Sequence, residues 1–586
     1  MSVIEIFRQL ARKRDLDHFF ASVIRGNIAV RYQCQPNMRL VVWLQGKLGA
    51  TLVAKVRRPP LCLSILVTVI SLQQSIAQGQ QPSTNTPTFR ATSNLVFLDV
   101  TVLDRKGRPV VKGLTKDDFI ITEDRKPQRI FSFEPPETHS IPANARDDNP
   151  EAKTPVTMFV LDRLNSSFED FAFIRYSVRK YLSAQPAQLH APTELMVIGN
   201  ESLELLQGYT RSRDDLLYTL DHLRPVLPYK MMIPSFFAER FVQSIEALQQ
   251  IALQNKGVPG RKNVVWLGLG GPGLSLRGIT GKSLDRLNQE VHGTTNMLVD
   301  ARISLYVIFP GLKFEDPTIL PGGDVNDSVR KNDPFVGDVN FGVFVSETGG
   351  NLFYNNNDFD GEMKRSQELG SKYYTLTYQP HDVAPDGMFR RVRVTLRDPN
   401  LLAVTKAGYY APDGKSLVDP RHQSMIDLAE AARSNVPFTA LDLKVSDVVR
   451  HPDSGSVELT LELKGKNLGW LPMDDGKSTT SLIVGATSMS RRRDILASRF
   501  ETLTYMAATQ DPSRLAKNLT RVTVTLQLPR KTQSVRVVVQ AEEGGQIGTA
   551  DVDRRRLDAA TAMPTPGPEP VLQTTSQESP TAPVRR

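Results

Sequence analysis

Between residues 155 and 370, short apolar runs alternate with longer amphipathic stretches, and this alternation restricts the fold more than any other feature of the chain. The first run, 155–161, ends in Asp162, and a loop with small polar residues at 165–167 leads into a helical pattern. Strands that alternate with helices build parallel sheets with helices on both faces. We therefore predict an α/β fold with a doubly wound, mostly parallel sheet over 155–370.

Asp162 stands at the predicted carboxyl edge of this sheet, where open α/β sheets bind their ligands. Asn165 and Ser166 follow it in the same loop, and Asn200 and Glu201 follow a neighbouring predicted strand. Carboxylate, amide and hydroxyl groups at such an edge can bind a ligand by hydrogen bonds or hold a cation. These five residues form the candidate ligand-binding set.

The basic charge of the chain is concentrated at its beginning. Residues 1–77 hold 11 Lys or Arg and 3 Asp or Glu, which leaves 61 basic and 60 acidic residues for the rest of the chain. The net charge of +9 therefore comes from this leader, and the remainder has no basic surplus of the kind that binds nucleic acid. We expect no nucleic-acid partner.

The leader contains the pattern of a secretory signal peptide. Basic residues at 55–58 precede an uncharged apolar run at 61–72, and the small residues of 75–77 predict cleavage near residue 77. The run is shorter than the roughly 20 residues of a membrane-spanning helix. We predict an extracytoplasmic protein, and the signal segment is its membrane contact if it stays uncleaved. Because a long basic stretch precedes this pattern, a start at Met38 is an alternative.

The rest of the chain divides by composition. Both cysteines, Cys34 and Cys62, lie in the leader, so we expect no disulfide or cysteine-bound metal beyond it. Alternating apolar and polar residues predict strands on both sides of the α/β domain, and a segment rich in Pro, Thr and Ser predicts a disordered end. The expected parts are a leader at 1–77, a linker at 78–93, a small β module at 94–134, the α/β domain at 155–370, a β extension at 371–411, a β-sandwich at 436–552 and a disordered tail at 560–586.

These motifs together resemble a family of exported bacterial proteins, of acidobacterial type, described as von Willebrand factor A-related. The resemblance implies a Rossmann-type von Willebrand factor A-like domain between small β modules, and it implies a fold more than an activity. The segments that carry it are LDVTV at 98–102, LTKDDF at 114–119, VLD at 160–162, GRKNVVW at 260–266, TGGNLFY at 348–354, YYTLTY at 373–378 and AGYYA at 407–411.

The resemblance also implies a metal motif that this chain keeps only in part. Metal-binding A domains end their first strand in Asp-x-Ser-x-Ser, because Mg²⁺ needs a shell of oxygen ligands. Here Asp162 and Ser166 match, but Leu164 cannot bind a metal, and 268–273 offers no second carboxylate. We expect a degenerate site without a cofactor, in which Asp162 accepts backbone N–H groups of its own loop. Mg²⁺ at Asp162 and Ser166 is the alternative.

No other motif supplies a catalytic centre. Gly268, Gly270 and Gly273 have the spacing of a dinucleotide-binding loop, but Pro272 interrupts it and no acidic residue follows at the next strand end. A glycine-rich surface loop explains the pattern better. The chain also has neither a nucleophile elbow nor a phosphate-binding loop of the Walker type. We therefore expect a protein that is not an enzyme.

The sequence favours an exported binding, adhesion or scaffold protein whose partner is a protein or an envelope polymer. Two alternatives stay open. One is a metal-dependent envelope hydrolase that uses Asp162 with Glu201 or Asp170. The other is a purely structural component of the envelope.

Overall fold

The computed structural model of the protein describes residues 28–35, 39–46, 51–53, 95–139, 154–272, 274–275, 281–309, 338–339, 341–354, 358–381, 384–414, 420–562 and 584–585. The chain divides into two units, Met1–Ser93 and Asn94–Arg586. The expected signal segment at 61–77, the linker at 78–93 and most of the tail at 560–586 lie outside the described residues. Within the described residues, no helix has the length and hydropathy needed to cross a membrane.

The first unit contains one small antiparallel sheet. Its strands pair in the order β1-β2-β3. They are β1 (Ile28–Gln35), β2 (Arg39–Gly46) and β3 (Thr51–Val53).

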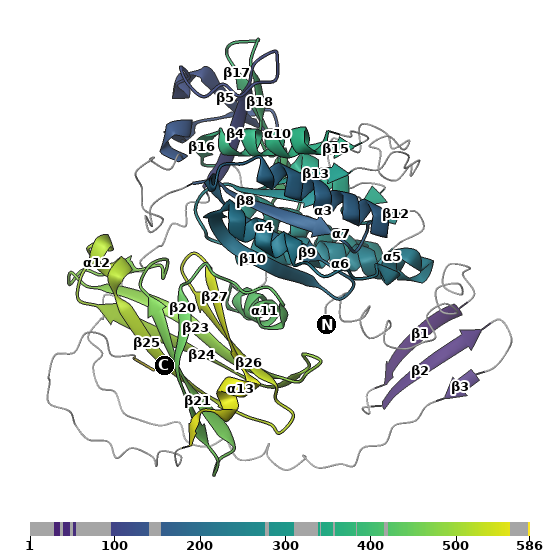
Figure 1. Ribbon diagram of the computed structural model, residues 1–586, viewed down its shortest axis with the longest axis vertical. Coiled ribbons are helices and arrows are strands. Elements are labelled where there is room, and N and C mark those ends of the chain that lie inside the picture. Colours follow the sequence, from purple (N-terminus) through teal and green to yellow (C-terminus); the bar gives the residue numbers. More distant parts are fainter. Residues whose placement is uncertain are drawn as a thin grey trace, which may run out of the picture. The chain divides into compact units, whose positions relative to one another are not determined.

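The second unit is built around a six-stranded sheet with the order β10-β9-β8-β11-β13-β15 (Figure 1). All neighbours are parallel except β9 and β10, which are antiparallel. The structure is therefore mixed α/β, and this sheet is mostly parallel. Its strands are β8 (Val156–Asp162), β9 (Gln188–Ile198), β10 (Leu203–Ser212), β11 (Lys262–Leu267), β13 (Ile303–Phe309) and β15 (Leu352–Tyr354).

Helices cover both faces of this sheet because its central strands are apolar on both sides. Met158 and Val160 of β8 pack into one core cluster, and Phe159 and Leu161 pack into another. Strand residues alternate between faces, so an uninterrupted apolar run needs cover on both. The first cluster contains residues of α6 (Phe237–Gln254), α7 (Lys282–Asp300) and α9 (Phe341–Glu347), and the second those of α3 (Phe168–Ser183), α4 (Arg213–Asp221) and α10 (Phe359–Ser371).

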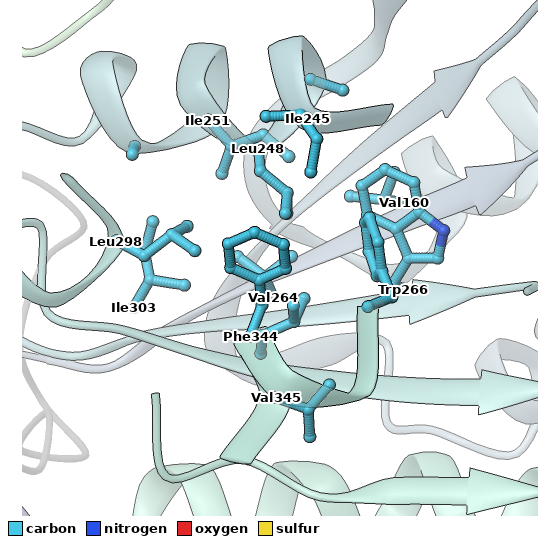
Figure 2. Packing of buried hydrophobic residues seen from close by; sticks show 14 of the residues in the cluster. Val160, Ile245, Leu248, Ile251, Val264, Trp266, Leu298, Ile303, Phe344 and Val345 are labelled. Atoms are coloured by element: carbon cyan, nitrogen blue, oxygen red, sulfur yellow. The ribbon is translucent and has the colours of Figure 1, made fainter. Parts of the chain in front are cut away.

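Figure 2 shows the first cluster, in which Trp266 and Val160 of the sheet lie near Ile245 and Leu248 of α6. The indole of Trp266 is fully buried. Burial of a large side chain of this kind stabilises a fold by roughly 1.5–3 kcal/mol. This packing holds α6 against the carboxyl ends of β8 and β11.

Polar caps set the start of two helices on the other face. Ser167 accepts a hydrogen bond from the backbone N–H of Asp170 and begins α3, which fixes the end of the loop after β8. Ser212 accepts from the backbone N–H of Asp215 and begins α4. A serine with two acidic residues in the turn that follows it is a local signal for a helix start.

Segments from both sides of the α/β domain share two four-stranded sheets, with the orders β18-β4-β16-β7 and β19-β17-β5-β6. From the sequence, 94–134 and 371–411 were separate β parts, whereas here they pair with each other. Tyr374, for instance, pairs with Val100. The strands are β4 (Val96–Leu103), β5 (Phe119–Glu123), β6 (Lys126–Gln128), β7 (Ile130–Glu134), β16 (Tyr374–Tyr378), β17 (Phe389–Leu396), β18 (Leu402–Val404) and β19 (Gly408–Tyr410).

The C-terminal region begins with α11 (Pro420–Arg433) and continues as two sheets that enclose an apolar cluster. The paired strands have the orders β25-β21-β20-β28 and β27-β26-β23-β24-β29. The strands are β20 (Leu443–His451), β21 (Ser456–Lys464), β23 (Ser478–Met489), β24 (Ile495–Ala507), β25 (Leu519–Gln527), β26 (Ser534–Ala541), β27 (Ile547–Asp553), β28 (Thr561–Ala562) and β29 (Val584–Arg585).

Candidate functional site

Asp162 lies where the strand order of the central sheet reverses. β8 and β11 are neighbours, but the chain continues from β8 to β9 on one side and from β11 to β13 on the other. Loops that leave such a pair of strands diverge, and the crevice between them is where open α/β sheets bind ligands. Asp162 is the last residue of β8, and Gly268 directly follows β11. The structure therefore places both residues at the switch point of the strand order.

The carboxylate of Asp162 is fully buried and surrounded by hydrogen-bond donors. Its Oδ1 accepts the backbone N–H of Asn165 at 2.9 Å, as expected for a carboxylate that stabilises its own loop. Its Oδ2 accepts Trp266 Nε1 and the backbone N–H of Gly270, each at 2.9 Å. Asn165 Nδ2 lies 3.2 Å from both oxygens. Both carboxylate oxygens are thus occupied by neutral N–H groups.

Asn165 links Asp162 to the positively charged side chain of Arg240. Arg240 of α6 donates from Nε to Asn165 Oδ1 at 3.1 Å, and the Asn165 amide also donates to Ser244 Oγ at 3.1 Å. Burial raises the pKa of Asp162, and hydrogen bonds from Trp266 and Asn165 offset part of that rise. The arrangement is a sealed polar network between β8, β11 and α6.

The residues at this crevice do not fit a divalent cation. A metal would need free carboxylate lone pairs, but those of Asp162 point at N–H groups, whose positive ends repel a cation. Leu164, at the position of the first serine ligand, is fully buried in the apolar core. Ser166 Oγ is a buried oxygen without a hydrogen-bond partner, and one hydroxyl does not make a metal site. Among the described residues, no group of three His, Cys, Asp or Glu side chains is placed to hold a metal.

Gly268 makes the close approach of the two loops possible. A Cβ at this position would lie 2.5 Å from Asp162 Cβ and 3.1 Å from Ser166 Oγ. Its φ of +141° also favours glycine. The glycine-rich stretch after β11 is therefore used to pack backbone against Asp162, and one of its N–H groups, that of Gly270, binds the carboxylate.

Asn200 and Glu201 belong to a different group of contacts. Asn200 Nδ2 donates to the carbonyl of Leu227 at 2.8 Å, and Tyr229 Oη donates to Glu201 Oε1 at 2.9 Å. Both predicted residues therefore hold the loop that follows α4 and leads into the short helix α5 (Tyr229–Met232). The structure places them in a pocket beside the crevice, without a direct hydrogen bond to Asp162. That they bind a ligand stays a prediction.

This pocket has a volume of about 780 Å³ and lies between the turn after β9, the helix α4 and the loop 222–229. Its charged and aromatic lining includes Arg163, Glu201, Glu204, Tyr218, His222 and Arg224. The rings of Tyr218 and His222 lie 4.0 Å apart between centroids. The volume falls within the range of about 300–1,000 Å³ that is usual for small-molecule sites.

Arg163 is the residue of this pocket that sequence reasoning missed. It directly follows Asp162, its side chain is only 6% exposed, and it lines the pocket. Successive residues at a strand end point to opposite sides, so Asp162 turns toward α6 while Arg163 turns toward α3. An arginine at the end of an otherwise apolar strand was the available signal.

The other carboxylate of the hydrolase alternative is engaged in a helix cap. Asp170 Oδ2 accepts a hydrogen bond from Ser167 Oγ at 2.9 Å, and Ser167 in turn caps the N-terminus of α3. Within the described residues, Asp162, Asp170 and Glu201 share no hydrogen-bond partner in these contacts.

The loop beside the pocket exposes apolar side chains to solvent. Leu227 is 59% exposed and Met232 is 65% exposed. Val226, Tyr229 and Ile233 are also exposed along the same stretch. Large apolar groups clustered on a surface mark interaction sites more often than single ones do. We refer to 226–233, a stretch that includes α5, as the apolar loop.

Comparison with known proteins gives little support for a relative. No family model matches the chain, and no curated protein matches it. Among solved structures, the crystal structure of the SpRpn10 VWA domain is 15% identical, covers 27% of this chain and 90% of its own, and has a TM-score of 0.14. A likeness at this level establishes neither a relative nor a function for this chain.

Proposed function

We propose that this chain is an exported, non-enzymatic binding protein, acting in adhesion or as a scaffold, whose von Willebrand factor A-like domain binds a partner without a bridging metal. The apolar loop is the observation that carries the proposal. Its exposed side chains gather at the carboxyl edge of the central sheet, next to a pocket and close to the crevice where α/β sheets bind ligands. A protein surface with complementary apolar groups is the partner that fits best.

The strand order supports the finer fold assignment. Counted along the domain, the six strands lie in the order 3-2-1-4-5-6, with the third strand antiparallel to its neighbour. This is a doubly wound order, and Asp162 ends its first strand, as in the family that the sequence resembles. The sealing of Asp162 by N–H groups supports a metal-independent mode of binding.

The proposed export is based on the signal pattern at 55–77, which lies outside the described residues. Sequencing the N-terminus of the protein recovered from the producing cell tests it. We expect the mature protein to begin near residue 78, and a terminus upstream of residue 57 contradicts cleavage.

The binding proposal is tested by a pull-down from an envelope extract with the mature chain as bait. We expect Met232→Asp in the apolar loop to abolish capture of the partner. Met388→Asp is the matched control, because Met388 is also exposed, at 57%, but lies in the β region away from this loop. Equal capture by both variants contradicts the proposal. Ordered self-association without a captured partner favours the structural-component alternative.

A further inference from the structure

Arg163 occupies an unusual place for a charged side chain. Its backbone N–H donates to the carbonyl of Ile198 at 3.0 Å, which sets the residue between the ends of β8 and β9. The guanidinium then crosses Gly199, where a Cβ would lie 2.8 Å from Nη2. The ring of Phe171 lies 5.8 Å from the guanidinium carbon on another side. Gly199 and Phe171 thus lie beside the guanidinium of Arg163, and the same side chain lines the pocket.

Very few of the hydrogen-bond donors of Arg163 have partners. An arginine offers five N–H groups. Nη1 reaches the carbonyl of Arg224 at a long 3.4 Å, and Nε is buried without any partner. Glu204 attracts the charge electrostatically but forms no hydrogen bond with it within the described residues. A buried cation in this state is unfavourable unless another group supplies acceptors.

Two other deeply buried arginines of the described residues, Arg261 and Arg536, are satisfied internally. Arg261 donates to the side-chain oxygens of Thr101, Ser304 and Tyr306. Arg536 binds the carboxylate of Asp551 through two nitrogen atoms, at 2.8 and 2.7 Å. The protein supplies side-chain oxygens to these two arginines, and it supplies Asn165 Oδ1 to Arg240, which is 7% exposed. Among the described residues, it supplies only the carbonyl of Arg224 to Arg163, whose side chain lines a pocket of about 780 Å³.

The rest of the lining narrows the class of ligand. Two arginines, Arg163 and Arg224, and two glutamates, Glu201 and Glu204, line the pocket, so its fixed charges balance. A balanced pocket with one buried guanidinium suits a single negative charge and disfavours a polyanion. Leucine and valine side chains with the ring of Tyr218 form the remaining walls, which suits an apolar or aromatic body.

We propose that this pocket binds a small organic carboxylate, whose two oxygens are held by the guanidinium of Arg163 while its apolar body lies against the loop 222–229. Planar guanidinium and carboxylate groups match in a two-point hydrogen-bonded pair. This proposal does not rest on the proposed function, although Val226, Leu227 and Tyr229 belong both to the pocket and to the apolar loop. The carboxylate can belong to a free organic acid or to the C-terminus of a peptide, and both present the same chemistry.

The test is isothermal titration of the mature chain with 3-phenylpropionate. The series also includes the neutral amide of this acid and phenyl phosphate. It ends with one short peptide that has a C-terminal phenylalanine, tested with a free and with an amidated C-terminus. We expect phenylpropionate to bind about ten- to hundredfold more tightly than its amide. If the site takes the C-terminus of a peptide, the peptide with the free C-terminus should bind more tightly than the amidated one. If it takes only a free organic acid, neither peptide should bind. Equal binding of acid and amide, tighter binding of phenyl phosphate, or no binding of any carboxylate at millimolar concentration overturns the proposal.

Variants separate a binding role from a structural one. Arg163→Gln should lose the same factor in affinity for phenylpropionate without a lower melting temperature, because it removes an unpaired buried charge. Arg179→Gln is the matched control, an exposed arginine of the same domain that is paired with Asp221 outside the pocket, and it should bind normally. Val226→Trp fills the pocket from an exposed position and should block binding with Arg163 intact. Unchanged affinity in Arg163→Gln contradicts the assignment.

Discussion

At the amino edge of the central sheet, three basic residues stand at the starts of parallel strands, whereas at the carboxyl edge one acidic residue ends a strand. Lys262 is the first residue of β11, Arg261 directly precedes it, and Arg302 directly precedes β13. Arg302 Nε donates to Asp99 Oδ2 of β4 at 3.0 Å, and Arg261 Nη1 donates to Thr101 Oγ1 of the same strand at 2.9 Å. The amino edge therefore uses its charges to bind another part of the same chain.

The charged side chains at the carboxyl edge have different hydrogen-bond partners. Asp162 is sealed by neutral N–H groups, and Arg163 keeps most of its donors free beside a pocket. Internal pairing at one edge stabilises the contact between the α/β domain and the shared β sheets. Incomplete pairing at the other edge leaves binding capacity. The contact with the shared β sheets is therefore made at the amino edge, and the binding that we propose belongs to the carboxyl edge.

The largest expected effect comes from breaking the amino-edge ion pair. Arg302 and Asp99 have side chains that are 16% and 10% exposed. Asp99→Asn should lower the free energy of unfolding by about 3–5 kcal/mol, because it leaves a buried guanidinium without its carboxylate. Urea unfolding followed by circular dichroism measures the change.

The pH dependence and a surface pair provide checks on this prediction. Burial acts to raise the pKa of Asp99, but Arg302, together with Arg261 and Thr375, holds that pKa below its ordinary value. The stabilisation is therefore present above the ordinary pKa and is lost as the pH falls through the lower folded value. Asp221→Asn, which breaks the exposed pair with Arg179, should leave stability unchanged. Equal losses of stability in both variants would contradict a larger contribution of the amino-edge ion pair.

Asp162→Asn should have a smaller effect. The new amide places an NH₂ group against the N–H of Trp266 or Asn165, which leaves a donor unsatisfied at a cost of about 1–3 kcal/mol. Arg240 loses a nearby negative charge but keeps its hydrogen bond to Asn165. Burial raises the pKa of Asp162 above 3.8, so the wild type loses stability as the pH rises through the folded pKa, and the variant should not. A loss larger than that of Asp99→Asn reverses the comparison of the two edges.

The pH dependence of stability tests the burial of Lys262 at the amino edge. Burial and repulsion from Arg302 lower its pKa to about 7, against an ordinary value of 10.5. Between these values the unfolded chain holds a proton that the folded chain lacks, so stability increases with pH. This contribution is about 2 kcal/mol between about pH 7 and about pH 9. Lys262→Met should remove that part of the slope in thermal melts, and an unchanged slope shows that the lysine is not buried as described.

Much of the α/β domain was predictable because its signals are local. An apolar run such as 156–161 needs cover on both faces wherever it lies, and Ser212 with two acidic residues marks a helix start within four positions. The shared β sheets were not predictable in this way. The pairing of Val100 with Tyr374 depends on contacts between distant segments.

The candidate site was predictable where it depends on strand ends and their loops. The contact between Asp162 and the backbone of Asn165 lies within one loop, and the sequence indicated it. The sequence also grouped Asn200 and Glu201 with Asp162, but their partners lie in the loop 222–230. Arg163 was missed because its significance is the lack of a partner, which only the folded arrangement reveals.

The smallest expected effect is that of a divalent cation on the melting temperature. Millimolar Mg²⁺, Mn²⁺ or Ca²⁺ should produce no shift, since both oxygens of Asp162 already accept N–H groups. Leu164→Ser restores the missing hydroxyl of the metal motif but leaves those donors in place, so it should also show no shift. Adding Trp266→Phe removes one donor from Oδ2 and should produce the first measurable shift of the series. A shift in the wild type that Asp162→Ala abolishes shows instead that the carboxylate turns toward a metal, and that the carboxyl edge recognises its partner through an ion.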